Sequence, residues 1–353
     1  MQTSEQEGLE MLVRNVGEGE EELEQYDYST LSEVDSCARK AVLKYVCNKR
    51  ATEKESQALH MGASAHKVFS ALRLWELLVH GEAFYGEDWN ERKRDAVQVR
   101  MVELHPWMED LKFCMEGDYD RARTKFVAMA VAESGFTEDE EDDKRTLMNF
   151  EDAMHYHAEN VNWCKALPLV MDDGFVGVEQ HFNLVLELGE WKRRFVGQID
   201  GIHWYSGKRD ALMVVENKTT SRISQIWKDS FMLSHQLTGY CLAAEALSGM
   251  HVNMGLVPGQ AIPVPKSNPD NGYCLEPFFR EAMAFEEWAR WFKSGVERLE
   301  SFVHVDDAPM ATGACTQYFS KCQFMDYCYS GKEEREALLE GYRDYTWDPL
   351  VND

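Results

Sequence analysis

Hydrophobic and polar positions alternate in several short segments after the middle of the chain, and this alternation predicts β-strands. Successive side chains of a strand point to opposite faces, so a half-buried strand repeats every two residues. Segments with this pattern cover residues 176–187, 193–204, 211–218 and 251–262. We therefore expect these segments to form one sheet.

Other segments have apolar residues three and four positions apart, which predicts helices. Helices are expected over residues 57–79, 223–248 and 277–303, and one or two more over 28–48. Residues 91–165 are mostly polar with helical character, and we expect this insertion to form an arch over a site in the sheet. The predicted fold class is α/β, with a mixed central sheet flanked by helices.

Two carboxylates and a lysine lie at the predicted ends of two neighbouring strands. Asp200 closes a Gly-x-x-Asp turn, and Glu216-Asn217-Lys218 ends the apolar run 211–215. Residues i and i+2 share a face of a strand, so Glu216 and Lys218 point the same way and Asn217 points opposite. If the two strands pair, Asp200 joins them in one site.

This combination suits metal-dependent hydrolysis of a phosphodiester. Carboxylate oxygens are the ligands that Mg²⁺ and Mn²⁺ prefer, so Asp200 and Glu216 can hold one or two such ions. Lys218 can orient a water and stabilise charge on the phosphate. The alternative is that all three are ordinary surface charges at strand ends. Glu179, on the first predicted strand, either adds a carboxylate to the site or is a solvated strand residue.

Three further polar residues lie on predicted helices. Gln236 and Tyr240 are four positions apart and share a helix face, where they can bind a DNA phosphate or the lysine. The alternative is a solvated glutamine and a tyrosine packed in the core. His66 follows Gly62 on the helix over 57–79, and it is either a metal ligand or a packed or surface residue.

Three of the nine cysteines lie close together near the end of the chain, as Cys315-x6-Cys322-x5-Cys328, and Cys37 is a fourth candidate far upstream. Four thiolates suit an iron–sulfur cluster or a structural zinc ion. The alternative is buried free thiols, which are common in protein cores. The other five cysteines fit no ligand spacing and are predicted to be ordinary thiols.

In the order of these motifs the chain resembles the RecB/AddB-type nucleases of the PD-(D/E)XK superfamily. The similarity is greatest to their iron–sulfur branch, which includes CRISPR-associated RecB-like exonucleases and phage versions. It covers about Leu31 to Cys328 and consists of an upstream cysteine, a helical histidine, G-x-x-D, E-x-K, Q-x3-Y and three cysteines. The predicted organisation is an acidic tail over residues 1–25, a helical region over 26–175, the nuclease core over 176–303, and the cysteine segment with the C-terminal tail over 304–353.

The resemblance implies a role for each motif. His66, Asp200 and Glu216 match the metal ligands and Lys218 the catalytic lysine. Gln236 and Tyr240 match residues that contact DNA. The cysteines match the ligands of a [4Fe–4S] cluster, and these are Cys37, Cys315, Cys322 and Cys328. The family usually spaces the last three cysteines as C-x2-C-x5-C, whereas the first gap here is six residues, so zinc or no metal remains an alternative at this site.

The resemblance also implies an exonuclease that acts on DNA ends with Mg²⁺ or Mn²⁺, in recombination, repair or phage DNA metabolism. The sequence contains no P-loop motif, so a helicase or other recombination protein would have to be a separate partner. One alternative is a non-hydrolytic module that binds DNA ends or a partner protein, and another is a zinc-clamped scaffold.

Charge and hydropathy add limits to this hypothesis. The formal net charge is −25, and two acidic segments, residues 1–25 and 138–143, supply about half of it. Local basic groups at 192–194 and 208–209 are the candidates for attracting DNA, and the alternative for both is an ordinary solvated face. No apolar run reaches the roughly 20 residues that span a membrane, and the N-terminus has no signal-peptide pattern. We expect a cytoplasmic protein of a bacterium or of a virus-infected cell.

Overall fold

The structure is a computed structural model that describes residues 11–17, 19–50, 57–109, 118–138, 144–161, 166–205, 209–316 and 321–348. The chain folds into two compact units, each built from separate stretches of sequence. The first unit consists of Met1–Lys54, His181–Gln198 and Glu281–Asp353, and the second of Glu55–Gln180 and Ile199–Arg280. Strands β4 (Val178–Leu188) and β5 (Trp191–Trp204) contribute residues to both units.

The sheet of the second unit centres on β8 (Met254–Ala261). Strands β6 (Leu212–Val215) and β7 (Lys218–Thr220) pair in parallel with successive stretches of β8, at Gly255–Leu256 and at Gly259–Ala261. β6 also pairs antiparallel with the end of β5, and β9 (Tyr273–Phe279) pairs antiparallel with β8. Two residues therefore interrupt the path from β6 to β7, and these are Glu216 and Asn217.

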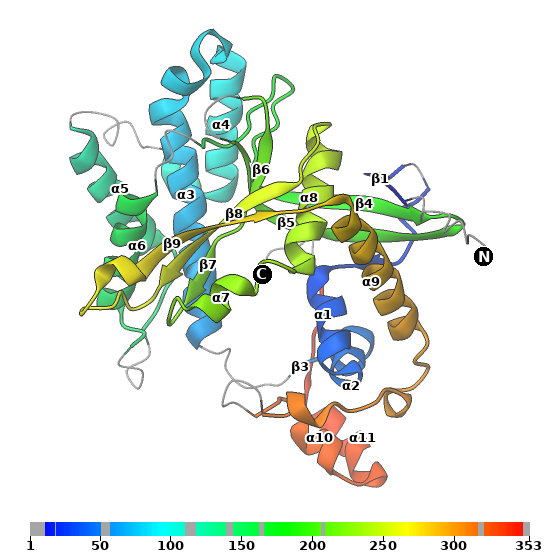
Figure 1. The fold of residues 1–353 in the computed structure, drawn as a ribbon. Coiled ribbons are helices and arrows are strands. Elements are labelled where there is room, and N and C mark those ends of the chain that lie inside the picture. Colours follow the sequence, from blue (N-terminus) through cyan, green and yellow to red (C-terminus); the bar gives the residue numbers. More distant parts are fainter. Residues whose placement is uncertain are drawn as a thin grey trace, which may run out of the picture. The chain divides into compact units, whose positions relative to one another are not determined.

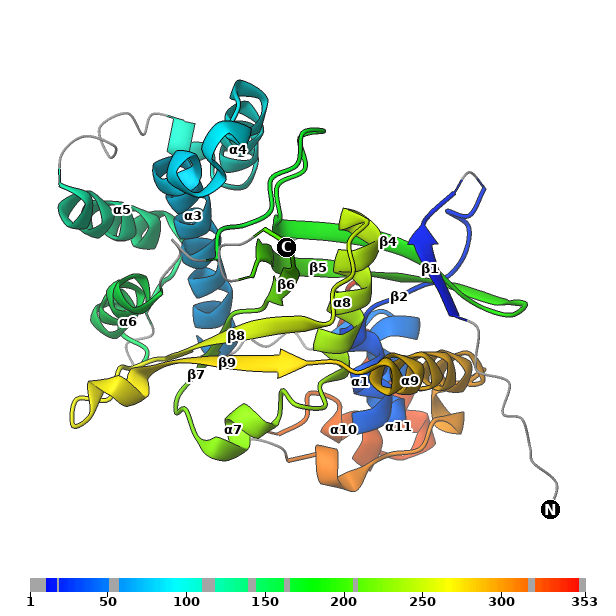
Figure 2. The ribbon, with the colours of Figure 1, turned by 45° about the horizontal axis from the view of Figure 1, so that its top comes forward.

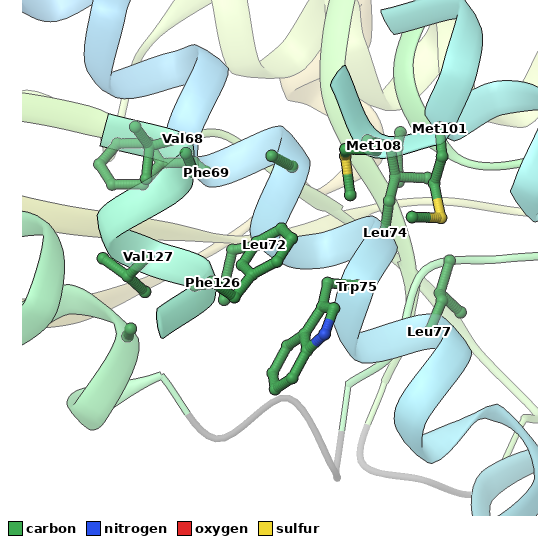
Figure 3. Close-up of a cluster of buried hydrophobic side chains, with 14 of the residues drawn as sticks. Val68, Phe69, Leu72, Leu74, Trp75, Leu77, Met101, Met108, Phe126 and Val127 are labelled. Atoms are coloured by element: carbon green, nitrogen blue, oxygen red, sulfur yellow. The ribbon is translucent and has the colours of Figure 1, made fainter. Parts of the chain in front are cut away.

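Three helices of the second unit pack against the long helix α3 (Gln57–Tyr85), as Figure 1 shows, and these are α4 (Glu91–Leu104), α5 (Tyr119–Glu133) and α6 (Leu147–Asn160). The same unit also contains α7 (Gln225–Asp229) and α8 (His235–Ser248). Side chains of α3 and α5 form the core between them, where Trp75 stacks on Phe126 at 5.2 Å between ring centroids (Figure 3). Helix α8 packs on β6 and β8, across the sheet (Figure 2).

The first unit contains the remaining strands and helices. Strand β1 (Met11–Asn15) pairs antiparallel with β4, and β2 (Gln25–Tyr26) pairs in parallel with β5. Strands β3 (Lys49–Arg50) and β10 (Arg343–Asp344) form a separate two-stranded sheet. The helices of this unit are α1 (Tyr28–Ser36), α2 (Ala38–Ala41), α9 (Ala282–Glu300), α10 (Met325–Tyr329) and α11 (Lys332–Glu340). Trp288 and Phe292 of α9 pack with Phe195 in its core, with ring centroids 5.0 and 5.4 Å from that of Phe195.

The predicted fold class is confirmed, because a mixed, mostly antiparallel central sheet is flanked by helices. Several local predictions were wrong. Asp200 lies within β5 rather than in a turn, and Met11–Asn15 of the expected tail forms β1. The single helix expected over 223–248 is two helices, α7 and α8. Residues 277–279 belong to β9, and the helix after them, α9, begins only at Ala282. Among the described residues, no helix is long and apolar enough to cross a membrane.

Candidate active site

Three potential metal ligands from three elements meet in the second unit. His66 on α3, Glu179 on β4 and Asp200 on β5 each offer a ligand atom, and these atoms all lie within 4.8 Å of one another. His66 Nδ1 is 3.2 Å from Asp200 Oδ2. Glu179 has a φ of 50°, in the left-handed region, which costs a residue with a Cβ about 1–2 kcal/mol. Such strain is typical of residues held in place for a function.

The break between β6 and β7 brings a further residue to Asp200. The backbone N–H of Asn217 donates to Asp200 Oδ2 at 2.8 Å, and its side-chain Nδ2 donates to the same oxygen at 3.2 Å. The prediction that Asn217 points away from this site was wrong. Glu216 and Asn217 lie outside both strands, so the two-residue alternation that assigned their faces does not hold there.

Lys218 is held by a chain of polar side chains. Its Nζ donates to Glu216 Oε1 at 2.7 Å and to Gln236 Oε1 at 3.1 Å. Gln236 Nε2 in turn donates to Glu216 Oε1 at 3.3 Å and to the hydroxyl of Tyr240 at 3.1 Å. The structure therefore brings these four residues together. The hydroxyl of Tyr240 is engaged by Gln236 although the rest of its side chain is buried in the core.

Glu216 has room for another ligand. Its second oxygen, Oε2, is buried and has no hydrogen-bond partner among the residues that the structure describes. A buried carboxylate oxygen without a partner is costly. A divalent cation shared with the neighbouring Asp200 would satisfy it, so the donor set of carboxylates and one imidazole fits Mg²⁺ or Mn²⁺.

Arg73 binds the backbone of Asp200 and is a candidate site residue that was not predicted from the sequence. Its side chain is fully buried, and NH1 donates to the backbone oxygen of Asp200 at 2.6 Å. Its charge acts on Asp200, Glu179 and Glu216. The sequence did contain an indication, because Arg73 follows His66 by seven residues and so lies on the same face of the helix. An arginine at that spacing does not by itself indicate any particular chemistry.

The charges of the cluster shift its protonation equilibria. Burial disfavours the imidazolium of His66, but the charge of Asp200 and its hydrogen bond outweigh burial and raise the pKa of His66 to about 9. Burial and the charge of Asp200 raise the pKa of Glu179 to about 8, and the same two causes raise the pKa of Glu216. Burial opposes ionisation of Asp200 as well, yet His66 and Arg73 hold its pKa below the usual range.

Binding of a divalent metal ion is expected to release protons and to strengthen as the pH rises. Metal ligands bind in their deprotonated forms, whereas His66 keeps its proton below about pH 9 and Glu179 below about pH 8. Raising the pH through this window removes competing protons, so the affinity should increase by up to about tenfold per pH unit for each proton displaced. Calorimetric titration with Mn²⁺ in two buffers of different ionisation enthalpy counts those protons. An affinity that stays constant between about pH 6 and about pH 9 would contradict this assignment.

The four candidate cysteines meet in the first unit. Cys37, Cys315, Cys322 and Cys328 all line one small cavity. The backbone N–H of Ala311 donates to the sulfur of Cys37 at 3.5 Å, and burial raises the thiol pKa of Cys322 and Cys328. Most of the six-residue gap after Cys315, residues 317–320, lies outside the described residues.

The remaining candidates are engaged in local structure. Arg193 pairs with Glu300, Lys192 with Glu187, and Arg194 donates to the backbone oxygen of Leu23. Arg209 pairs with Asp88, while Lys208, residues 139–143 of the acidic run, Cys114 and Cys164 lie outside the described residues. The three basic groups at 192–194 thus have partners in the first unit, which reduces their use in attracting DNA.

Comparison with known proteins identifies the class to which this fold and site belong. The sequence profile of the PD-(D/E)XK nuclease superfamily matches residues 27–329, and the chain therefore belongs to that superfamily. It is accordingly a nuclease, with nucleic acid as its substrate class and a divalent metal as its cofactor. No curated protein has a sequence significantly similar to the chain.

Two examples among the solved structures with distant similarity are both Rai1 proteins. Rai1 of Scheffersomyces stipitis, in complex with (3'-NADP)+ and calcium ion, is 12% identical, with 78% of this chain and 76% of that chain covered and a TM-score of 0.21. Rai1 of Candida albicans, in complex with pU5-Mn2+, is 12% identical, with 84% and 82% covered and a TM-score of 0.20. Similarity at this level carries no argument about function.

Proposed function

We propose that the chain is an exonuclease that hydrolyses phosphodiester bonds at DNA ends and belongs to the RecB/AddB-like branch of its superfamily. The observation that carries this proposal is the meeting of His66, Glu179 and Asp200 with the Glu216–Lys218 pair in one unit. A carboxylate cluster with a lysine beside it is what phosphodiester hydrolysis requires. The order of motifs along the chain supports DNA ends as the substrate.

Each residue has a role in this proposal. His66, Glu179, Asp200 and the second oxygen of Glu216 would hold Mg²⁺ or Mn²⁺. When bound, the ion supplies positive charge that polarises the scissile phosphate and makes a nearby water more acidic. Lys218, oriented by Glu216 and Gln236, stabilises the negative charge that develops on the phosphate. Gln236 and Tyr240 position the DNA strand, and Asn217 and Arg73 keep Asp200 in place.

We further propose that Cys37, Cys315, Cys322 and Cys328 hold a [4Fe–4S] cluster. The lining of one cavity by all four thiols supports a shared centre, and the N–H donated to Cys37 is the kind of contact that supports a thiolate ligand. A zinc ion is the alternative occupant of the same four ligands. The same proposal includes three further points. The protein takes part in recombination, repair or phage DNA metabolism, works with a separate helicase, and is located in the cytoplasm.

Cleavage of end-labelled linear DNA with Mg²⁺ or Mn²⁺ tests the proposed activity. The wild type should shorten linear DNA from its ends and leave closed circular DNA intact. Lys218→Ala should be slower by at least about 10²-fold, the usual effect of losing one charge-stabilising group. Lys125→Ala, which removes an exposed lysine of α5, is the matched control and should behave like the wild type.

Other outcomes would change the proposal. Cutting of closed circular DNA would replace the exonuclease by an endonuclease. Failure to cut single- or double-stranded DNA with either metal would favour a non-hydrolytic binding role. Equal rates for Lys218→Ala and the wild type would remove Lys218 from the site.

A further inference from the structure

The segment that joins Lys218 to Gln236 starts and ends at the candidate active site. Lys218 begins β7, Gln236 is the second residue of α8, and their side chains hydrogen-bond at 3.1 Å. Between them lie α7 and a series of turns that ends at Ser234 (Figure 2). Leu233 precedes Gln236 by only three residues, so the end of this segment adjoins along the chain a residue that is proposed to position the DNA strand.

Three large apolar side chains of this segment point into solvent. Ile226 is 84% exposed, Met232 66% and Leu233 89%. The segment does have access to a core, because Trp227 packs against the backbone of β8 at Gly259, and Phe231 is buried with its ring 4.7 Å from that of Trp227. Trp227 and Phe231 thus pack inward while Ile226, Met232 and Leu233 are exposed, and packing does not explain the exposed side chains.

A buried arginine fixes the turn that presents two of these side chains. Arg280 donates to the backbone oxygens of Phe231, Met232 and Ser234 at 3.0, 3.0 and 3.3 Å, and to Thr238 Oγ1 at 2.7 Å. Each bond of a buried guanidinium to such an acceptor holds the backbone in one conformation. Met232 and Leu233 are thus displayed on a rigid turn, and a rigid apolar surface binds a ligand with little loss of conformational entropy.

The charge of the segment suits an anionic ligand. It carries Arg222 and Lys228 against Asp229, whereas the whole chain has a net charge of −25. Arg222 is exposed, and Lys228 is 3.8 Å from Glu276. A nucleic acid strand combines an anionic backbone with apolar base faces. In a duplex those faces are stacked on one another, so an apolar side chain must unstack them to make contact, whereas unpaired bases expose their faces without that cost. Ile, Met and Leu are among the residues that proteins insert against bases.

We propose that Ile226, Met232 and Leu233 form an apolar surface that contacts unpaired bases of the strand entering the active site. This inference rests on the proposed function, because it assigns the substrate of that site. It makes single-stranded or frayed DNA the preferred substrate. Three features favour the substrate strand over a partner protein as the occupant of this surface. The turn leads directly into Gln236, the segment carries a net positive charge, and Arg280 holds the turn in one conformation.

Binding can be tested separately from cleavage. The affinity of the full chain for a fluorescent single-stranded oligothymidine and for a blunt duplex is measured by anisotropy, with Ca²⁺ in place of Mg²⁺ or Mn²⁺ to limit cleavage. The double variant Met232→Gln/Leu233→Gln should bind the single strand about tenfold more weakly, the lower end of the effect of no longer burying a Leu or Met side chain. Its affinity for the blunt duplex should change by less than about twofold.

The chain offers a matched control. Leu147 and Met148 on α6 are also adjacent and exposed, at 41% and 62%, so Leu147→Gln/Met148→Gln makes the same chemical change elsewhere in the second unit. Unchanged single-strand affinity of this control, with weakened affinity of the test variant, would support the proposal.

Three results would overturn it. Unchanged single-strand affinity of Met232→Gln/Leu233→Gln shows that the surface contacts no bases. Equal weakening for single strand and duplex shows contact with DNA but not with unpaired bases. Unchanged DNA affinity with a loss of self-association in size-exclusion chromatography assigns the surface to a protein contact. A wild type that binds single strands through this surface but cleaves nothing would refute the proposed hydrolysis and leave the binding inference standing.

Discussion

Asp200→Asn is expected to lower kcat/KM for DNA cleavage by at least about 10³-fold, which corresponds to about 4 kcal/mol of transition-state stabilisation. Asp200 is the residue around which the site is organised, since it is 3.2 Å from His66 and accepts two hydrogen bonds from Asn217. The substitution keeps the shape and one accepting oxygen but removes the charge that a divalent ion requires. Cleavage of end-labelled DNA measures the loss of activity, and calorimetric titration with Mn²⁺ measures the loss of metal affinity.

A change in His66 distinguishes loss of this charge from general damage. The charge and hydrogen bond of Asp200 raise the pKa of His66 to about 9, so Asp200→Asn should lower the pKa of His66 in an NMR titration. Asp120→Asn, at an exposed aspartate of α5, is the control and should change neither the rate of cleavage nor the pKa of His66. Activity of Asp200→Asn close to that of the wild type would exclude Asp200 as a metal ligand.

Cys37→Ser is expected to destabilise the first unit strongly. If the four thiolates hold a common metal centre, metal binding contributes to the free energy of folding, so removing one ligand lowers the stability of the unit. We expect the Tm to fall by about 10 °C or more, which for a unit of this size represents several kcal/mol. Protein purified without oxygen should show broad visible absorbance and about four iron atoms per chain if the centre is a [4Fe–4S] cluster.

The occupant and the role of the cysteines can be separated. A colourless protein with one zinc per chain and the same fall in Tm would replace the cluster by a structural zinc site. Cys47→Ser changes a half-buried cysteine of the same unit that does not line the cavity, and it should keep both the metal and the Tm. No metal in the wild type, together with equal Tm values for the two variants, would show that these cysteines are ordinary thiols.

Much of the site could be predicted because its residues follow strands with clear periodicity. The alternation of apolar and polar residues locates the strands β5, β6 and β8; Asp200 lies within β5, and Glu216 and Lys218 follow β6 directly along the chain. Strand pairing then brings Asp200 near Glu216, since Gly201 is paired with Val215. These are relations between neighbours in sequence or across one strand pair, which local patterns specify.

Glu179 and Arg73 could not be assigned in this way. Glu179 reaches the site with a φ of 50°, which no strand periodicity predicts, and its sequence allowed a solvated carboxylate equally well. Arg73 looks like an ordinary charged helix residue until α3 packs against the sheet and places its guanidinium on the backbone oxygen of Asp200. Its full burial depends on compensation by carboxylates from other elements.

Long-range contacts also decided where helices and strands end. Residues 223–248 have helical character throughout, yet α7 and α8 are separate helices. The turn between them is held by Arg280, which lies 46 to 49 residues further along the chain and binds the backbone oxygens of Phe231, Met232 and Ser234. The single strand expected over 211–218 is interrupted where Asn217 turns its amide to Asp200.

The sequence by itself therefore determined the α/β class and the superfamily motifs, and it predicted the carboxylates, lysine and cysteines as site residues, because these depend on periodicity and on residue type. Only the tertiary structure decided that Glu179 joins His66 and Asp200, that Arg73 binds the backbone of Asp200, and that Met232 and Leu233 are exposed on the turn before α8. Each of these requires elements distant in the chain to meet. The role of a buried charge or of an exposed apolar side chain depends on neighbours that only folding brings together.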